Sequence, residues 1–89
     1  LILASRKLAD GEAARDEIRA MGRRAEAFAC HVGRWDDLAR LADAAYATFG
    51  KVDVLINNAG MSPVVPSSAE TTEDLFDKVV AVNFKGPFR

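Results

Sequence analysis

The sequence predicts an α/β fold in which helices cover both faces of a doubly wound parallel sheet. Short apolar runs alternate with longer amphipathic stretches, so the expected order is β-α-β-α-β-α. The runs are apolar throughout rather than alternating, which is typical of strands buried on both faces. The connections are short, and no repeat, low-complexity tract or internal linker interrupts the pattern.

Three apolar runs are the expected strands. Residues 1–4 end at a polar turn, residues 25–32 follow an arginine pair, and residues 52–56 are closed by Asn-Asn-Ala-Gly. Apolar runs of roughly four to eight residues between turn signals have the length of buried strands. In a doubly wound sheet, ligands bind beyond the carboxyl ends of the strands. The loops expected at that edge are residues 5–7, 30–33 and 57–60.

Two helices are predicted between these strands. In the first, Ala14, Ile18 and Met21 recur at helical spacing and Gly22 is a natural stop. Trp35 is expected to open the second, because the two acidic residues after it complement the dipole of a helix N-terminus. The second helix should end at Gly50, and its apolar stripe is Leu38, Leu41, Ala42, Ala45 and Phe49.

A third helix is predicted after the loop 61–68. Thr71 and Asp74 resemble a capping box, with Asp in place of the usual Glu. Leu75, Val79 and Val82 then form the apolar stripe of this helix.

The composition excludes several classes of protein. With 12 basic and 13 acidic residues among 89, the net charge is −1, which gives no basic surface for nucleic acid or an anionic membrane. No apolar run approaches the roughly 20 residues that span a bilayer. One cysteine cannot form an internal disulfide, and one histidine beside it makes no metal cluster, so no metal is expected. We expect a cytoplasmic protein.

Three motifs resemble the short-chain dehydrogenase/reductase family. The apolar run 52–56 followed by Asn57, Asn58, Ala59 and Gly60 resembles the family's fourth strand and its N-N-A-G turn. Residues 82–88, Val-Asn-Phe-Lys-Gly-Pro-Phe, resemble its V-N-x-x-G-x-F motif, and residues 4–6 resemble the end of its second strand. The motifs occur in the family's order and spacing over the whole chain. The resemblance implies a partial Rossmann-type domain that binds NAD(P).

The resemblance assigns the N-N-A-G turn to the cofactor. In the family, Asn57 would tie the central strands together, while the backbone of Asn58, Ala59 and Gly60 would lie under the cofactor ribose. Gly60 has no Cβ where backbone must approach a ligand closely. The alternative is a simple turn, because Asn and Gly favour turns in any protein.

The resemblance also suggests which dinucleotide binds. A carboxylate at the end of the second strand would bind the adenosine ribose diol and repel a 2′-phosphate. This chain has the neutral Ser5 there, followed by Arg6, whose guanidinium can grip a phosphate, and Lys7 adds positive charge. NADP(H) is therefore the preferred cofactor, with NAD(H) still open. The alternative is an ordinary exposed basic loop.

Two further positions carry expectations from the family. Asn83 matches a member of a catalytic tetrad, which distorts its helix so that a main-chain carbonyl holds a water of the proton relay. The alternative is an Asn near a helix end that is broken by Gly86 and Pro87. His31 departs from the family, which usually has an Asp there to accept a hydrogen bond from the adenine amino group. His31 could accept through a neutral ring nitrogen, and Val32 would pack on the adenine face.

The resemblance implies an oxidoreductase that interconverts a carbonyl and an alcohol, with a ketone or 3-oxoacyl compound, a simple alcohol or a sugar as substrate. The family's glycine-rich turn and its catalytic Ser, Tyr and Lys have no match in the 89 residues. We therefore expect a central fragment that is inactive alone, from a parent that forms a homodimer or homotetramer. The alternatives are a non-catalytic nucleotide sensor or scaffold, and a free-standing α/β module.

Overall fold

The computed structural model describes residues 1–89 and contains a two-stranded parallel sheet. Strand β1 (Ile2–Ser5) pairs with β2 (Glu26–Ala29), and the register joins Ile2 to Glu26 and Ser5 to Ala29. Just beyond the paired residues, the Cys30 N–H donates to the Ser5 carbonyl oxygen at 2.9 Å. The predicted strand at residues 25–32 is therefore present but shorter. The carboxyl ends of both strands meet at one edge, as a parallel pair requires.

Helix α1 (Leu8–Ala20) connects the two strands and packs on the sheet. Gly11 is buried in this contact, since a Cβ on it would lie 3.3 Å from the Cβ of Ala27. Ala14 and Ile18 are half-buried as their spacing predicts, but the expectation for Met21 is wrong. The helix ends before Met21, which is 74% exposed.

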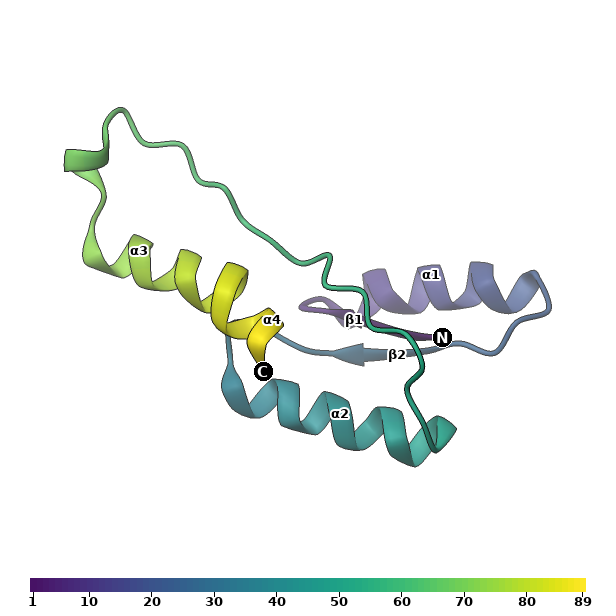
Figure 1. Cartoon of the computed structure of the whole chain (residues 1–89). Helices are drawn as coiled ribbons and strands as arrows, with labels where there is room; N and C mark the ends of the chain where they lie inside the picture. The colour runs from purple at the N-terminus through teal and green to yellow at the C-terminus, as the bar shows by residue number, and fades with distance from the viewer.

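Helix α2 (Trp35–Phe49) lies on the side of the strands opposite α1, so the two helices enclose the sheet (Figure 1). It begins at Trp35 and is stopped by Gly50, whose φ of 77° is left-handed and suits a glycine. The core is small, and its buried apolar residues are Ala25, Cys30 and Ala45.

Residues 51–67 form no helix or strand, so the predicted strand at 52–56 is wrong. In Figure 1 the chain leaves the end of α2, passes across the two strands in this view without becoming a third strand, and then continues as a long extended segment. Leu55 and Ile56 are 75% and 77% exposed. A doubly wound sheet has its strands side by side in the order 3-2-1-4, numbered along the whole fold. In this chain β2 and β1 lie in the first and second places from the left of that order, and residues 52–56 would lie in the fourth place. It would reach the sheet only through a strand in the third place, and no segment of this chain occupies that place.

A short 3₁₀ turn, η1 (Ser68–Glu70), precedes a continuous helical stretch of three parts. These are α3 (Glu73–Val80), the π-helix η2 (Ala81–Lys85) and α4 (Gly86–Phe88). The N-cap of α3 is Thr72, whose Oγ1 accepts from the Leu75 N–H at 3.2 Å, so the predicted capping pair Thr71–Asp74 is wrong by one residue. No helix in the chain is long and apolar enough to cross a membrane.

Candidate functional site

The parallel strands place two predicted groups of site residues side by side. Ser5 ends β1, and the loop that contains His31 and Val32 directly follows β2. Arg6 and Lys7 are exposed in the bend after Ser5, and neither forms an ion pair with a carboxylate of the chain. The edge therefore presents two free cations and no acidic group at the end of β1. This donor set fits a phosphate group better than a sugar diol.

The loop after β2 is held by hydrogen bonds to the start of α2. The His31 N–H donates to Asp37 Oδ2 at 2.9 Å, and the Arg34 N–H donates to the His31 carbonyl oxygen at 2.8 Å. The bond from His31 holds the pKa of the Asp37 carboxyl below its ordinary value, aided by the nearby positive charge of Arg40. Burial raises the pKa of the Cys30 thiol, so this residue is an inert part of the core.

The His31 side chain is oriented by its own loop. Its Nδ1 accepts a hydrogen bond from the Gly33 N–H at 3.1 Å. The ring nitrogen that could have accepted from a ligand on that side is therefore already in use. Sequence reasoning missed this bond, which joins residues two positions apart through a turn that only the folded loop defines.

Val32 lies against the last helical stretch. A Cβ on Gly86 would come within 2.7 Å of the Val32 carbonyl oxygen, closer than carbon and oxygen can approach. A Cβ on Gly33 would likewise lie 3.3 Å from Val82 Cγ2. The glycines at 33 and 86 thus allow close packing between the loop after β2 and the segment 82–86. The sequence motif showed Gly86, but not the partner that requires it.

Asn83 connects the same helical stretch to the loop after residues 52–56. Its Oδ1 accepts from the Met61 N–H at 2.9 Å, and its Nδ2 donates to the Met61 carbonyl oxygen at 2.8 Å. An amide is the side chain that can both accept and donate in this way, so an aspartate would satisfy only one of the two bonds. Met61 was not among the predicted site residues.

The main chain around Asn83 departs from α-helical geometry. Asn83 lies in the middle of the π-helix, where the Gly86 N–H donates to the Ala81 carbonyl oxygen five residues earlier. Pro87 stands four residues after Asn83 and has no N–H, so the Asn83 carbonyl lacks its α-helical donor. π-Turns of this kind are frequent at functional sites. The predicted distortion at Asn83 is therefore present.

The N-N-A-G residues lie next to this π-turn. Asn57, Asn58, Ala59 and Gly60 are all exposed, and the side chains of the two asparagines make no hydrogen bond within the chain. Their roles in strand tying and ribose contact stay predictions. An open hollow of about 480 Å³ separates this loop from the helix, and it is lined by Asn57, Ala59, Gly60, Met61, Ser62, Asn83 and Pro87.

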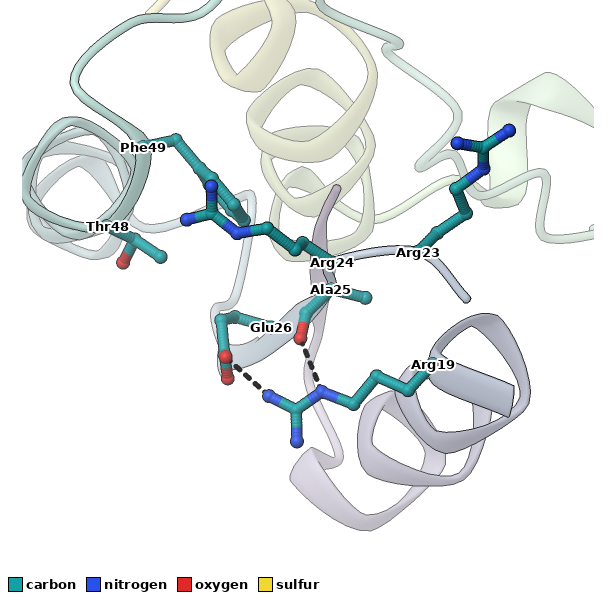
Figure 2. Close-up of a pocket in the computed structure, with 7 residues that line it drawn as sticks. All are labelled: Arg19, Arg23, Arg24, Ala25, Glu26, Thr48 and Phe49. Atoms are coloured by element: carbon teal, nitrogen blue, oxygen red, sulfur yellow. Dashed lines mark hydrogen bonds and ion pairs between the residues drawn. The ribbon is translucent and has the colours of Figure 1, made fainter. Parts of the chain in front are cut away.

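A second hollow, of about 280 Å³, lies at the opposite end of β2 (Figure 2). Arg19 forms an ion pair there with Glu26, and the Arg24 guanidinium lies 4.7 Å from the centroid of the Phe49 ring. Arg23 points away from both, as Figure 2 shows. This hollow adjoins the amino end of β2, so it is separate from the predicted site.

The site thus consists of two halves joined by one helical stretch. Of the predicted site residues, Ser5, Arg6, His31 and Val32 lie at the edge of the sheet, and Asn57, Asn58, Ala59 and Gly60 lie next to Asn83. No group of three or more His, Cys, Asp or Glu side chains in the chain could hold a metal ion.

Comparisons with known proteins agree on one family. The family described as short chain dehydrogenase matches residues 1–89. The human mitochondrial dehydrogenase/reductase SDR family member 2 is 33% identical over 87 residues, which are 98% of this chain and 31% of that protein.

Solved structures give the same result. A metagenomic short-chain oxidoreductase in complex with NADP matches with a TM-score of 0.93 at 33% identity, over 98% of this chain and 39% of that one. A 3-ketoacyl-(acyl-carrier-protein) reductase from Brucella melitensis complexed with NADH matches with a TM-score of 0.87 at 32% identity, over 98% of this chain and 35% of that one.

The chain spans about a third of the length of the relatives that it matches. Its relatives include structures with bound NADP and NADH, so binding of a nicotinamide dinucleotide is a property of the family. The match to the family covers every residue, and the first two predicted strands and the distorted helix at Asn83 are present. The chain is a member of the short-chain dehydrogenase/reductase family of oxidoreductases and carries part of its Rossmann fold.

Proposed function

We propose that the chain is the central part of a longer NADP(H)-dependent oxidoreductase that interconverts a carbonyl and an alcohol. The observation that carries the proposal is the π-turn at Asn83, whose side chain is fixed on Met61 and whose carbonyl lacks its helical donor. The rest of the parent would supply a glycine-rich turn and a catalytic Ser, Tyr and Lys. When bound, the nicotinamide supplies or accepts hydride.

The basic bend after β1 would select the dinucleotide. Arg6 and Lys7 are free of carboxylate partners, so both can bind a 2′-phosphate without first breaking an ion pair. Ser5 is small and neutral, and its carbonyl is already bonded to the Cys30 N–H, which fixes the backbone at that point. This arrangement favours NADP(H) over NAD(H).

Asn83 would act through its main chain. Both polar atoms of its side chain are used on Met61, so the side chain keeps the π-turn against the loop. The Asn83 carbonyl would hold a water that passes protons between solvent and the parent's Tyr and Lys. The open hollow beside it gives such a water access from solvent.

The parent's assembly is part of the same proposal. Phe76, Phe84 and Phe88 on the last helical stretch are 60%, 70% and 79% exposed. Exposed apolar rings that lie close together often mark a protein–protein interface. We propose a cytoplasmic homodimer or homotetramer that buries these rings. Sedimentation of the full-length protein tests this, and a monomer would contradict it.

Nucleotide binding by the full-length protein tests the cofactor. Changing Arg6 and Lys7 together to Ala should weaken NADPH binding about thirtyfold, because each group makes a charge-assisted hydrogen bond, while NADH binding should change little. Arg23→Ala is the matched control, since Arg23 is a basic residue on an exposed turn away from the site. Equal losses for both nucleotides would contradict the assignment.

Turnover tests the reaction. NADPH oxidation should be measured with a panel of ketones, 3-oxoacyl thioesters and sugars. Oxidation of NADPH with any of these carbonyls would support a reductase. NADPH binding without turnover of any carbonyl would instead favour the sensor function.

A further inference from the structure

The hydrogen bond to His31 Nδ1 determines which ring nitrogen carries the proton. The Gly33 amide can only donate, so Nδ1 must be the unprotonated nitrogen of the neutral ring. The proton is then on Nε2, which makes the outer side of the imidazole a hydrogen-bond donor.

The ring is also fixed in place and its donor is free. A Cβ on Gly33 would lie 3.1 Å from His31 Cε1, so the imidazole packs directly on the glycine backbone. No group of the chain bonds to Nε2, and the chain contains no buried side-chain N or O atom without a partner. The Nε2–H is therefore accessible to a ligand from solvent.

The sheet places this donor beside the expected adenosine. In dinucleotide-binding folds the adenosine ribose is bound at the end of the strand that Ser5 closes here. The Cys30 N–H donates to the Ser5 carbonyl oxygen at 2.9 Å, so His31 is the next residue at the same edge. The base joined to that ribose would lie at this same edge, on the side where His31 follows β2.

We propose that His31 recognises the base by donating to an acceptor at its N1–C6 edge, and not by accepting from the exocyclic amino group of adenine. A donor finds such an acceptor on either base, N1 in adenine or the 6-oxygen in hypoxanthine. A carboxylate at position 31 that accepts from the 6-amino group of adenine would face an acceptor, the 6-oxygen, at the same place in hypoxanthine, whose donor is N1–H instead. His31 is thus a specificity-determining residue that tolerates loss of the amino group. The inference rests on the proposed dinucleotide binding.

The test compares NADPH with its deamino analogue, in which hypoxanthine replaces adenine. Dissociation constants are measured on the full-length protein by the fluorescence of the reduced nicotinamide, which requires no turnover. The wild type should bind the two nucleotides within about twofold of each other. His31→Asp should prefer NADPH by about tenfold, because it replaces one hydrogen bond by a repulsion. His31→Asn has the same shape but keeps an N–H donor, so it should stay within about twofold.

Two results would overturn the inference while leaving the proposed function intact. One is a wild type that binds both nucleotides but prefers NADPH tenfold or more. The other is a nucleotide preference that is the same in the Asp and Asn variants, provided that both variants melt as cooperatively as the wild type. If neither nucleotide binds to the wild type, the proposed function fails and the role of His31 fails with it.

Discussion

Two regions of the chain begin from the same sequence pattern and reach different structures. The runs at residues 1–4 and 52–56 are both apolar and both end at polar turns. The first forms β1, because β2 pairs with it and α1 covers it. The second remains extended, with Leu55 and Ile56 about three-quarters exposed at 75% and 77%. A strand is therefore a property of a pair of segments, and an apolar run predicts only half of that pair.

The two halves of the site also differ in how many contacts hold them in place. The loop after β2 is fixed by several hydrogen bonds and by the contact of Val32 with Gly86. The loop after residues 52–56 is fixed mainly by the Asn83 side chain on Met61. Both loops depend on one helical stretch, the first through packing and the second through hydrogen bonds. The following variants, made in the full-length protein, break these attachments one at a time.

Gly86→Ala should have the largest effect. Its Cβ would lie 2.7 Å from the Val32 carbonyl oxygen, so the helix must move away from the loop, at a cost of about 3 kcal/mol in the free energy of unfolding. Gly60→Ala is the control, since its Cβ would meet Asn83 Oδ1 at an ordinary 3.7 Å. Denaturant unfolding measures the stability of both variants. Equal free energies of unfolding would show that the close approach of Gly86 to Val32 does not contribute to stability.

Asn83→Ala should come next. Two hydrogen bonds to Met61 are lost, which should lower the free energy of unfolding by about 2 kcal/mol. The more specific measurement is amide hydrogen exchange, in which the Met61 N–H should lose its protection. The His31 N–H, bonded to Asp37 in the other half, should keep its own. Loss of protection at both amides would mean that the two halves unfold as one unit.

Thr72→Ala should have an intermediate effect. It removes the hydroxyl that accepts from the Leu75 N–H, and loss of such a cap costs about 1 kcal/mol. Thr71→Ala, one residue earlier, removes the same groups from a side chain that caps nothing and should change the melting temperature little. If Thr71→Ala lowered the melting temperature more than Thr72→Ala, Thr71 would be the cap instead.

Asp37→Asn should have the smallest effect, and one that depends on pH. The His31 N–H lowers the pKa of the Asp37 carboxyl, so ionised Asp37 stabilises the folded state above the ordinary carboxyl pKa. This contribution is lost as the pH falls through the lowered pKa, so the difference between the wild type and the variant should begin to shrink near the ordinary carboxyl pKa of about 4 and should disappear only below the lowered pKa. Unfolding curves from neutral to acid pH measure the difference, and a constant difference would exclude the ionic contribution.

The sequence predicted the local elements of the fold well and the pairing of its third strand wrongly. The stripe through Ala14 and Ile18 and the stop at Gly50 depend on residues within one helix, so the pattern contains them. The strand at 52–56 depends on a neighbour outside its own sequence, which periodicity cannot supply. The cap at Thr72 was missed because two threonines stand side by side and only the backbone decides which one begins the helix.

For the site, the sequence supplied the residues but not their contacts. Asn83 and Gly86 were visible as a motif, whereas Met61 and the Val32 carbonyl, which explain that motif, were not. Both partners contribute backbone atoms, which every residue type has, so the sequence does not reveal these contacts. His31 was expected as an acceptor, and only the bond from Gly33 shows that its free nitrogen is a donor.

The freedom of Arg6 and Lys7 has a consequence for redesign. Neither side chain supports another part of the chain, so both can be replaced without disturbing the scaffold. Position 33 is different, because a Cβ on Gly33 would lie 3.1 Å from His31 Cε1 and 3.3 Å from Val82 Cγ2. An engineer who wishes to change the dinucleotide should therefore randomise positions 6 and 7 first. A library at position 33 would lose members to misfolding before their nucleotide preference could be screened.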